Sequence, residues 1–193
     1  MTYAQPAAAS VPRLIVLNGP PGCGKSTLAR RYVEDHPLAL DLDLDIDRIR
    51  DIIGRWRDHA GLLARAVALA AARAHLAGRH DVIIPQFLGR PEFIEQAECV
   101  AHETGAEFHE IVLLDGRENA LRRFAERSHT FTDPAHLDAQ RQLDRQGGAA
   151  ELAAMYDRLL AVVATRPGTR VVRTEHDRVD EVYANRRGSG VSL

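Results

Sequence analysis

Lysine is almost absent from this chain. Of the 25 basic residues only Lys25 is a lysine, and the others are arginines. Cysteine is also scarce, because Cys23 and Cys99 are too few for a disulfide framework or a cysteine-based metal site. No apolar run approaches the roughly 18 residues that a membrane span needs. These absences exclude a disulfide-rich secreted domain and predict a protein of the reducing cytoplasm with no membrane partner.

A strong surplus of charge of either sign is missing as well. The net charge is −2, so composition gives no electrostatic argument for binding to nucleic acid. The apolar fraction of 45% and the charged fraction of 27% are typical of a globular protein. The 193 residues correspond to one domain that is large enough to bury a core.

The predicted domain lies between two short terminal segments. Residues 1–12 are rich in alanine and proline but lack the basic head and apolar stretch of a signal peptide, so we expect a disordered lead-in. Residues 13–187 form a single predicted domain, and residues 188–193 form a tail. Within the domain, residues 128–148 turn polar and predict a small helical lid.

Apolar runs alternate with helical patterns along the chain. Strands are predicted at 13–18, 38–44, 81–85, 108–114 and 169–174. Helices are predicted at 26–35, from 45 or 47 to 56, and at 61–77, 91–104, 121–127, 149–165 and 177–186. This alternation predicts an α/β fold, a three-layer α/β/α arrangement with a five-stranded parallel sheet.

A glycine-rich segment between the first strand and the first helix carries the strongest functional signal. Gly19 to Ser26 reads Gly-Pro-Pro-Gly-Cys-Gly-Lys-Ser, which satisfies the pattern G-x-x-x-x-G-K-[ST]. An apolar strand precedes it and a helix follows, which is the context that this pattern requires. The sequence therefore predicts a P-loop that binds the phosphates of a nucleotide.

The residue types of this loop suit a bound phosphate chain. Gly22 and Gly24 let the backbone curl so that successive N–H groups face one anion, and the next helix directs its N-terminal amides at the same place. Lys25 is expected to reach the β- and γ-phosphates and the Ser26 hydroxyl to ligate Mg²⁺. The predicted ATP-binding residues are Gly19, Gly22, Cys23, Gly24, Lys25, Ser26 and Thr27.

The absence of other motifs excludes several classes of P-loop protein. A GTPase would need an Asn-Lys-x-Asp motif, and the single lysine already lies in the loop. Motor and transporter ATPases are longer and carry signatures that this chain lacks. The size favours a core like that of the nucleoside monophosphate kinases.

Four aspartates, at 41, 43, 45 and 47, alternate with apolar residues after the second predicted strand. Four carboxylates on one face of a buried strand would be costly, so we expect the strand to end near Asp43. Asp45 and Asp47 then lie beside the phosphate site. Asp45 fits either a water-mediated Mg²⁺ contact or a helix cap.

Asp47 and Arg50 lie three residues apart and share a face of the predicted helix. A kinase that acts on a hydroxyl needs a carboxylate to orient the hydroxyl and accept its proton, and an arginine suits an anionic substrate. Asp47 is therefore a candidate base and Arg50 a candidate substrate clamp. The alternative is a helix cap with a solvated ion pair.

The chain resembles the small P-loop kinases of the AAA_33 type in three places, namely the loop, the segment Asp45 to Arg50 and a later Arg-x-x-x-Arg. That group includes the kinase domain of polynucleotide 5′-kinase, chloramphenicol phosphotransferase, gluconate kinase-like proteins, zeta toxins and tunicamycin-resistance-like proteins. In the polynucleotide kinase domain an Asp-x-x-Arg motif supplies the general base, and Asp47 and Arg50 match its spacing.

The resemblance also assigns residues nearer the C-terminus. A lid helix of these kinases carries Arg-x-x-x-Arg, which implies that Arg123 and Arg127 clamp the γ-phosphate, although such a pair also arises by chance in an arginine-rich chain. Many relatives end the third strand with a magnesium-shell aspartate, but this chain has Pro85-Gln86 there. Gln86 is a candidate for binding substrate or a metal-bound water, or is a polar residue that ends a strand.

The sequence thus predicts an ATP- and Mg²⁺-dependent kinase that phosphorylates a hydroxyl of a small-molecule acceptor. One alternative keeps the chemistry but makes the acceptor a nucleic-acid 5′-hydroxyl. Another is a nucleotide-dependent switch or regulatory ATPase that has no acceptor. The identity of the acceptor and the oligomeric state do not follow from the sequence.

Overall fold

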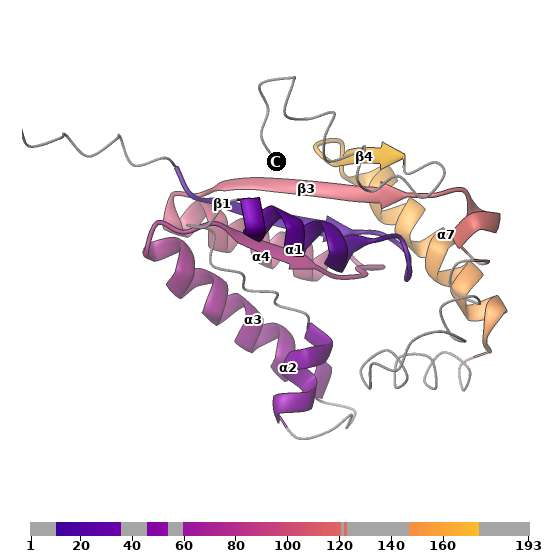
Figure 1. Cartoon of the computed structure of the whole chain (residues 1–193), viewed down its shortest axis with the longest axis horizontal. Coiled ribbons are helices and arrows are strands. Elements are labelled where there is room, and N and C mark those ends of the chain that lie inside the picture. The colour runs from indigo at the N-terminus through magenta and orange to yellow at the C-terminus, as the bar shows by residue number, and fades with distance from the viewer. Residues whose placement is uncertain (1–10, 36–45, 54–59, 121, 123–146, 174–193) are drawn as a thin grey trace, which may run out of the picture.

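Four parallel strands and the helices that cover them make up the part of the chain that the computed structural model describes, namely residues 11–35, 46–53, 60–120, 122 and 147–173 (Figure 1). The strands are β1 (Arg13–Asn18), β2 (Val82–Pro85), β3 (Glu107–Leu114) and β4 (Arg170–Arg173). The helices with stated bounds are α1 (Lys25–Asp35), α2 (Ile46–Ile53), α3 (Ala60–Ala77), α4 (Glu92–Thr104) and α7 (Ala149–Thr165).

The strands are ordered β2-β1-β3-β4, and every neighbouring pair is parallel. Leu14 pairs with Val82 on one side and with Phe108 on the other, so β1 lies inside the sheet. Because parallel strands need crossover connections, consecutive strands are joined through helices. All strands end at the same edge, where ligands bind in folds of this kind.

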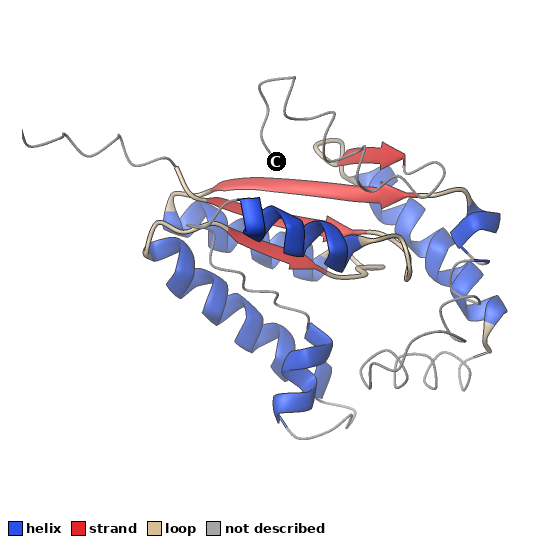
Figure 2. Cartoon of the chain, in the orientation of Figure 1, coloured by secondary structure: helices blue, strands red, loops and turns tan. Residues whose placement is uncertain are grey.

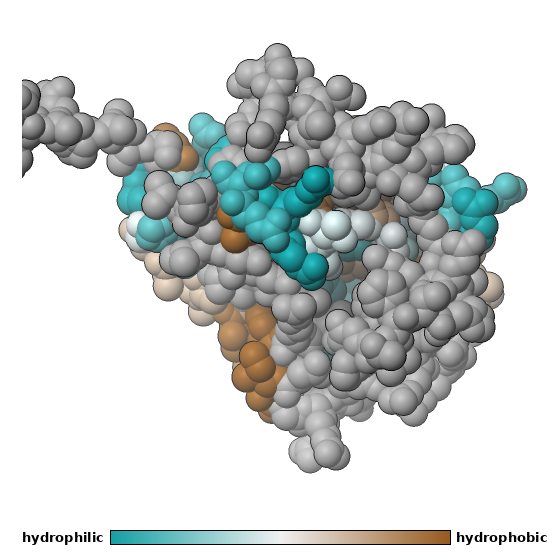
Figure 3. All heavy atoms as spheres, in the orientation of Figure 1, coloured by the Kyte–Doolittle hydropathy of each residue, from teal (hydrophilic) through white to brown (hydrophobic). Residues whose placement is uncertain are grey.

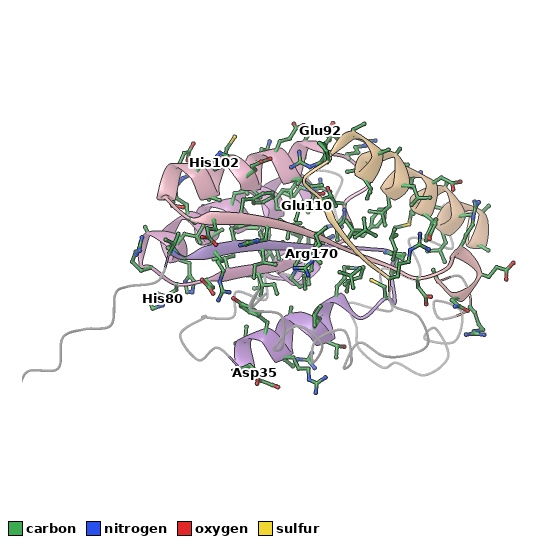
Figure 4. All side chains as sticks on the ribbon, turned by 90° about the horizontal axis from the view of Figure 1, so that it is seen from above. Asp35, His80, Glu92, His102, Glu110 and Arg170 are labelled. Atoms are coloured by element: carbon green, nitrogen blue, oxygen red, sulfur yellow. The ribbon has the colours of Figure 1, made fainter. Side chains whose placement is uncertain are left out.

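Alternate residues of β1 enter two separate cores. Leu14 and Val16 pack with residues of α2, α3 and α4, whereas Ile15 and Leu17 pack with α1. A strand that is buried on both faces is apolar throughout, which explains the unbroken run in the sequence. The helices therefore lie on both faces of the sheet, and Figure 4 shows α1 on one side with α4 and α7 on the other.

The prediction of a layered α/β fold with a parallel sheet is confirmed. The strands and helices whose bounds are given above begin within one residue of their predicted starts. Helical residues are also present from Arg117, four residues before the predicted start at 121. The predicted strand at 38–44 lies outside the described residues, as do the helix at 177–186 and nearly all of the lid at 128–148. The described residues therefore contain four of the five predicted strands.

Alanines bring α3 close to the rest of the fold. Its buried positions are Ala60, Ala64, Ala68, Ala72 and Leu76, which recur every fourth residue and therefore share one face. By length and composition α3 is apolar enough to cross a membrane, but a helix with one face in a protein core passes the same test. This helix therefore neither supports nor contradicts the prediction that the protein has no membrane partner.

Candidate functional site

The phosphate loop joins the carboxyl end of β1 to the first residue of α1. Figure 2 shows it as the tan segment before α1, at the end of the sheet to which the strand arrows point. Three glycines of this loop have positive φ, with values of 153° at Gly19, 85° at Gly22 and 92° at Gly24. Residues with a side chain rarely adopt these angles, so the glycines of the motif are required by the shape of the loop.

Gly19 is also needed because its neighbours leave no room. A Cβ at this position would lie 2.6 Å from the carbonyl oxygen of Leu113 and 2.7 Å from Sγ of Cys23. Leu113 belongs to β3, so the start of the loop rests directly on the neighbouring strand. The side chain of Cys23 is buried, with 2% exposed, and packs in the core beneath α1. The N–H of Cys23 donates to the carbonyl oxygen of Pro20 at 3.3 Å, within the loop itself.

Lys25 is the first residue of α1, one position earlier than predicted. Its ammonium group donates hydrogen bonds to the carbonyl oxygens of Gly19 (2.8 Å) and Pro20 (2.9 Å) and lies 3.8 Å from Sγ of Cys23. The only lysine of the chain is thus folded over the loop that it is predicted to serve. A phosphate would offer this cation a stronger, charge-assisted acceptor than two carbonyls do.

The first turn of α1 opens toward solvent. Ser26 and Thr27 are exposed, and the N–H of Leu28 donates to the carbonyl of Gly24 at 2.9 Å. Amides of the first helical turn have no acceptor within their own helix, and the helix dipole adds positive potential at this end. The site therefore combines amide donors, a hydroxyl and an ammonium group, which together suit a phosphate chain and the metal ion that accompanies it.

Asn18 is a residue of this site that the sequence analysis did not identify. It is fully buried, and its Oδ1 accepts hydrogen bonds from the N–H groups of Gly19 and Leu88, both at 2.8 Å. Its Nδ2 donates to the carbonyl oxygen of Leu88 at 2.9 Å. Asn18 therefore fixes the start of the phosphate loop to the segment that follows β2. A polar residue at the end of an otherwise apolar strand was the available signal.

Gln86 lies at the same edge of the sheet as the loop. Its N–H donates to the carbonyl oxygen of Leu17 at 3.0 Å, one residue beyond the last paired residue of β2, Pro85. The main chain of Gln86 therefore lies beside the end of β1, from which the phosphate loop starts.

The predicted acceptor residues are only partly described. Asp47 and Arg50 both lie in α2, and the Arg50 guanidinium carbon is 3.9 Å from where a Cβ on Gly61 would be, at the start of α3. The side chain of Asp47 lies outside the described part of the structure, and so do Asp45, Arg123 and Arg127 entirely. Their predicted roles remain predictions.

Asp115 is a second residue that the sequence analysis missed. It follows β3 and is buried, and its Oδ1 accepts hydrogen bonds from the N–H of Gly116 (2.8 Å) and the amide of Asn119 (3.2 Å). Its carbonyl oxygen accepts from the Tyr156 hydroxyl at 2.8 Å, which ties α7 to this edge. Burial and the nearby charge of Asp115 raise the pKa of Tyr156, so this hydroxyl remains a donor. The sequence signal was Leu-Leu-Asp-Gly at the end of a predicted strand.

A cavity of about 570 Å³ lies away from the phosphate loop, beside the first half of β3. Arg166 lines this cavity and donates hydrogen bonds to Glu110 at 2.6 Å and to Glu98 at 2.8 Å, two residues that line it as well. Burial lowers the pKa of Arg166, but the hydrogen bonds and charges of the two glutamates outweigh burial and raise it. Figure 4 shows Glu110 and Arg170 near the middle of the sheet. We interpret the three charges as a brace between α4, β3 and the turn after α7.

The fold and the loop define a P-loop protein with a parallel α/β sheet. Residues 14–152 match the family AAA_33, which is described as an AAA domain, and the chain belongs to this family. No protein with a curated description matches the sequence.

Solved structures share the fold at low sequence identity. The tunicamycin resistance protein of Deinococcus radiodurans is 15% identical, with a TM-score of 0.63 over 94% of this chain and 98% of that protein. A chain of the Pnkp1/Rnl/Hen1 RNA repair complex is 18% identical, with a TM-score of 0.60, and 91% of this chain covers 53% of it. A candidate kinase of Chloroflexus aurantiacus is 20% identical, with a TM-score of 0.53 over 66% of this chain and 74% of that one. At these identities the likeness concerns the fold.

Proposed function

We propose that this protein is a kinase that transfers the γ-phosphate of ATP to a hydroxyl group of a small molecule, with Mg²⁺ as the accompanying ion. The observation that carries the proposal is the geometry of the phosphate loop. Its glycines have positive φ, its lysine folds over it, and the first turn of α1 is open to solvent. Membership of the AAA_33 family supports the same class of activity.

Different residues of the loop would bind different parts of the nucleotide. The main chain of Gly22, Cys23 and Gly24 would supply amide donors, and Lys25 would leave the carbonyls of its own loop for the β- and γ-phosphates. Ser26 would ligate Mg²⁺ through its hydroxyl, with Thr27 beside it in the first turn. ATP supplies the phosphoryl group when bound, and the metal ion shields its negative charge.

The acceptor side rests on α2 and on the end of β2. Asp47 would orient the acceptor hydroxyl and accept its proton, while Arg50 would hold an anionic group of the same molecule. Gln86 suits a hydrogen bond to the acceptor, because its main chain is fixed beside the loop. Asp45 is the next carboxylate along the chain and is the alternative base.

Two arginines complete the proposed mechanism. Arg123 and Arg127 lie four residues apart and would reach the γ-phosphate from one side of a lid helix. A guanidinium group stays charged and binds two phosphate oxygens at once, so its contacts would strengthen as negative charge develops in the transition state. The lid at 128–148 would then influence which acceptor is admitted.

The test is to incubate the protein with ATP, Mg²⁺ and a metabolite extract and to search for compounds that gain ~80 Da, the mass of one phosphoryl group. Lys25→Met should lower the yield by ~10²-fold or more, since it removes a charge that stabilises the transition state. Arg30→Met is the matched control, because Arg30 is an exposed cation on the same helix.

The other outcomes are distinct. Release of inorganic phosphate without any labelled acceptor would contradict the proposal and favour a regulatory ATPase or switch. Transfer to an oligonucleotide that carries a 5′-hydroxyl, tested in the same assay, would replace the small molecule by nucleic acid. Full activity of Lys25→Met would show that the loop does not act as proposed.

A further inference from the structure

The outer face of α3 carries a row of exposed apolar residues. Leu63, Val67, Ala70, Ala74 and Ala77 follow one another at steps of four, three, four and three residues, and all five are exposed. This spacing averages 3.5 residues, which is the period of residues that face a partner helix in a coiled coil. We call these five residues the outer seam.

The outer seam lies opposite residues that are already buried. Ala64, Ala68 and Ala72 fill the inner face of α3, so a helix that needs only one apolar face has two. The large members of the seam are well exposed, with 52% of Leu63 and 41% of Val67 accessible, and Leu62 next to them is 66% exposed. Figure 3 shows hydrophobic atoms on the surface where α3 lies. Such an exposed patch indicates an interaction surface.

Charge on this face is low, and the charge that exists is neutralised within the chain. Helix α3 contains no Asp or Glu. The only charged residue on its exposed face, Arg73, donates to Glu103 of α4 from Nε at 3.2 Å and from Nη2 at 2.5 Å. A second copy of the same face would therefore meet no unbalanced like charge.

The seam is complementary to itself in size. Its large residues lie in the first half of α3 and its small residues in the second half. If two copies pack antiparallel with Ala70 at the two-fold axis, Leu63 of one lies opposite Ala77 of the other, and Val67 lies opposite Arg73, next to Ala74. Leu63 then fills the space that Ala77 leaves, and the central alanines allow a close approach of the two helices.

We propose that two copies of this chain associate through antiparallel packing of their α3 outer seams. The seam spans about 21 Å of helix at 1.5 Å per residue, so on its own it gives a small interface. We therefore expect a reversible dimer, whose population depends on protein concentration.

Sedimentation velocity of the full chain over a series of concentrations tests the proposal. The wild type should pass from monomer to dimer as concentration rises. Ala70→Glu should raise the dissociation constant of the dimer at least ~100-fold, because it places two carboxylates face to face at the axis. Ala161→Glu is the matched control, since Ala161 is an exposed alanine on α7, and it should dimerise like the wild type. Circular dichroism verifies that both variants are folded.

Cross-linking tests the orientation and does not depend on the Glu variant. In a Cys99→Ser background, which removes the exposed thiol, Leu63→Cys mixed with Ala77→Cys should give a disulfide-linked dimer on oxidation, and each variant alone should give far less. Self-linking of Leu63→Cys would contradict the antiparallel arrangement.

Two results would overturn the proposal altogether. One is a wild-type chain that stays monomeric at all concentrations. The other is a monomer that co-sediments with phosphatidylcholine and phosphatidylglycerol vesicles and loses this binding in Ala70→Glu, which would make the seam a lipid contact.

Discussion

The side chain of Asn18 is hydrogen-bonded to the main chain of Leu88, 70 positions later in the sequence. One amide side chain accepts a hydrogen bond from the N–H of Leu88 at 2.8 Å and donates one to its carbonyl oxygen at 2.9 Å. The same oxygen accepts from the N–H of Gly19, the first residue of the phosphate loop. The side chain of Asn18 therefore binds both the start of the phosphate loop and the segment after β2, and it has no contact with solvent.

Asn18→Ala should destabilise the protein by ~2–4 kcal/mol, because it leaves both main-chain groups of Leu88 buried without their partner. Affinity for ATP should fall as well, since the N–H of Gly19 loses its fixed direction. Urea unfolding and calorimetric titration of ATP measure the two effects. Asn119→Ala is the control, as it removes one half-buried hydrogen bond, to Asp115, and should cost ~1 kcal/mol. Equal losses in the two variants would show that Asn18 has no special role.

Gly19→Ala should destabilise the loop by ~2 kcal/mol or more and impair nucleotide binding. The new methyl group would lie 2.6 Å from the carbonyl oxygen of Leu113, which belongs to β3 and cannot move aside, and the φ of 153° would be strained in addition. Gly116→Ala is the matched change at the same end of the sheet. Its nearest atom would be 3.9 Å away, so it should stay within ~0.5 kcal/mol of the wild type in thermal or urea unfolding. A harmless Gly19→Ala would mean that the loop does not rest on β3.

Stability should depend on pH through Asp81. Burial raises the pKa of Asp81, but hydrogen bonds from Tyr32 (2.6 Å) and from the side chain and N–H of Arg13 outweigh burial and hold the pKa below its ordinary 3.8. A carboxyl whose folded pKa is depressed stabilises the fold above its unfolded pKa, and this contribution is lost as pH falls through the folded pKa. Stability should therefore drop below about pH 4.

Tyr32→Phe isolates this effect, since Tyr32 is fully buried and Phe keeps the ring. The loss should be ~1–2 kcal/mol at pH 7 and should shrink at pH 3, where Asp81 begins to bind a proton. Tyr156→Phe removes a hydrogen bond to a main-chain carbonyl, which does not titrate, so its cost in urea unfolding should be the same at both values of pH. A Tyr32→Phe cost that is independent of pH would contradict the assignment.

Asp47→Asn separates binding from chemistry. If Asp47 is the base, ATP affinity should be nearly unchanged while transfer falls by ~10²-fold or more, because Asn cannot take the proton. Single-turnover transfer at two Mg²⁺ concentrations, together with calorimetry, gives both quantities. A helix-capping role predicts no loss, since Asn caps a helix as well as Asp does. Partial rescue by Mg²⁺ would indicate a metal contact, and unimpaired transfer would leave Asp45 as the next candidate.

The elements of the fold follow from local signals. The run Leu14 to Leu17 is apolar because both faces of β1 are buried, and the glycines of the loop are needed for its φ values. Both features depend on residues that are close together in the sequence, so sequence patterns predict them. The start of α1 at Lys25 instead of Ser26 is a difference of one residue at a helix end.

The parts of the site that were missed depend on distant residues. Nothing beside Asn18 in the sequence indicates that Leu88 will lie against it, or that Tyr156 will reach the carbonyl of Asp115. Lys25 is a local exception, because its motif predicts a phosphate partner and gives no sign that the carbonyls of Gly19 and Pro20, six and five residues earlier, accept its hydrogen bonds. Partners separated by many residues are set by strand order, which sequence patterns do not specify.

The position of β1 between β2 and β3 has a consequence for how the protein is made. The phosphate loop is synthesised about 90 residues before the end of β3, yet Gly19 rests on Leu113 and Asn18 on Leu88. At about 5–20 residues per second, the ribosome needs roughly 5–20 s to supply these supports. During that interval the loop cannot hold its final shape, so a nascent chain should acquire affinity for nucleotide only after β3 has emerged.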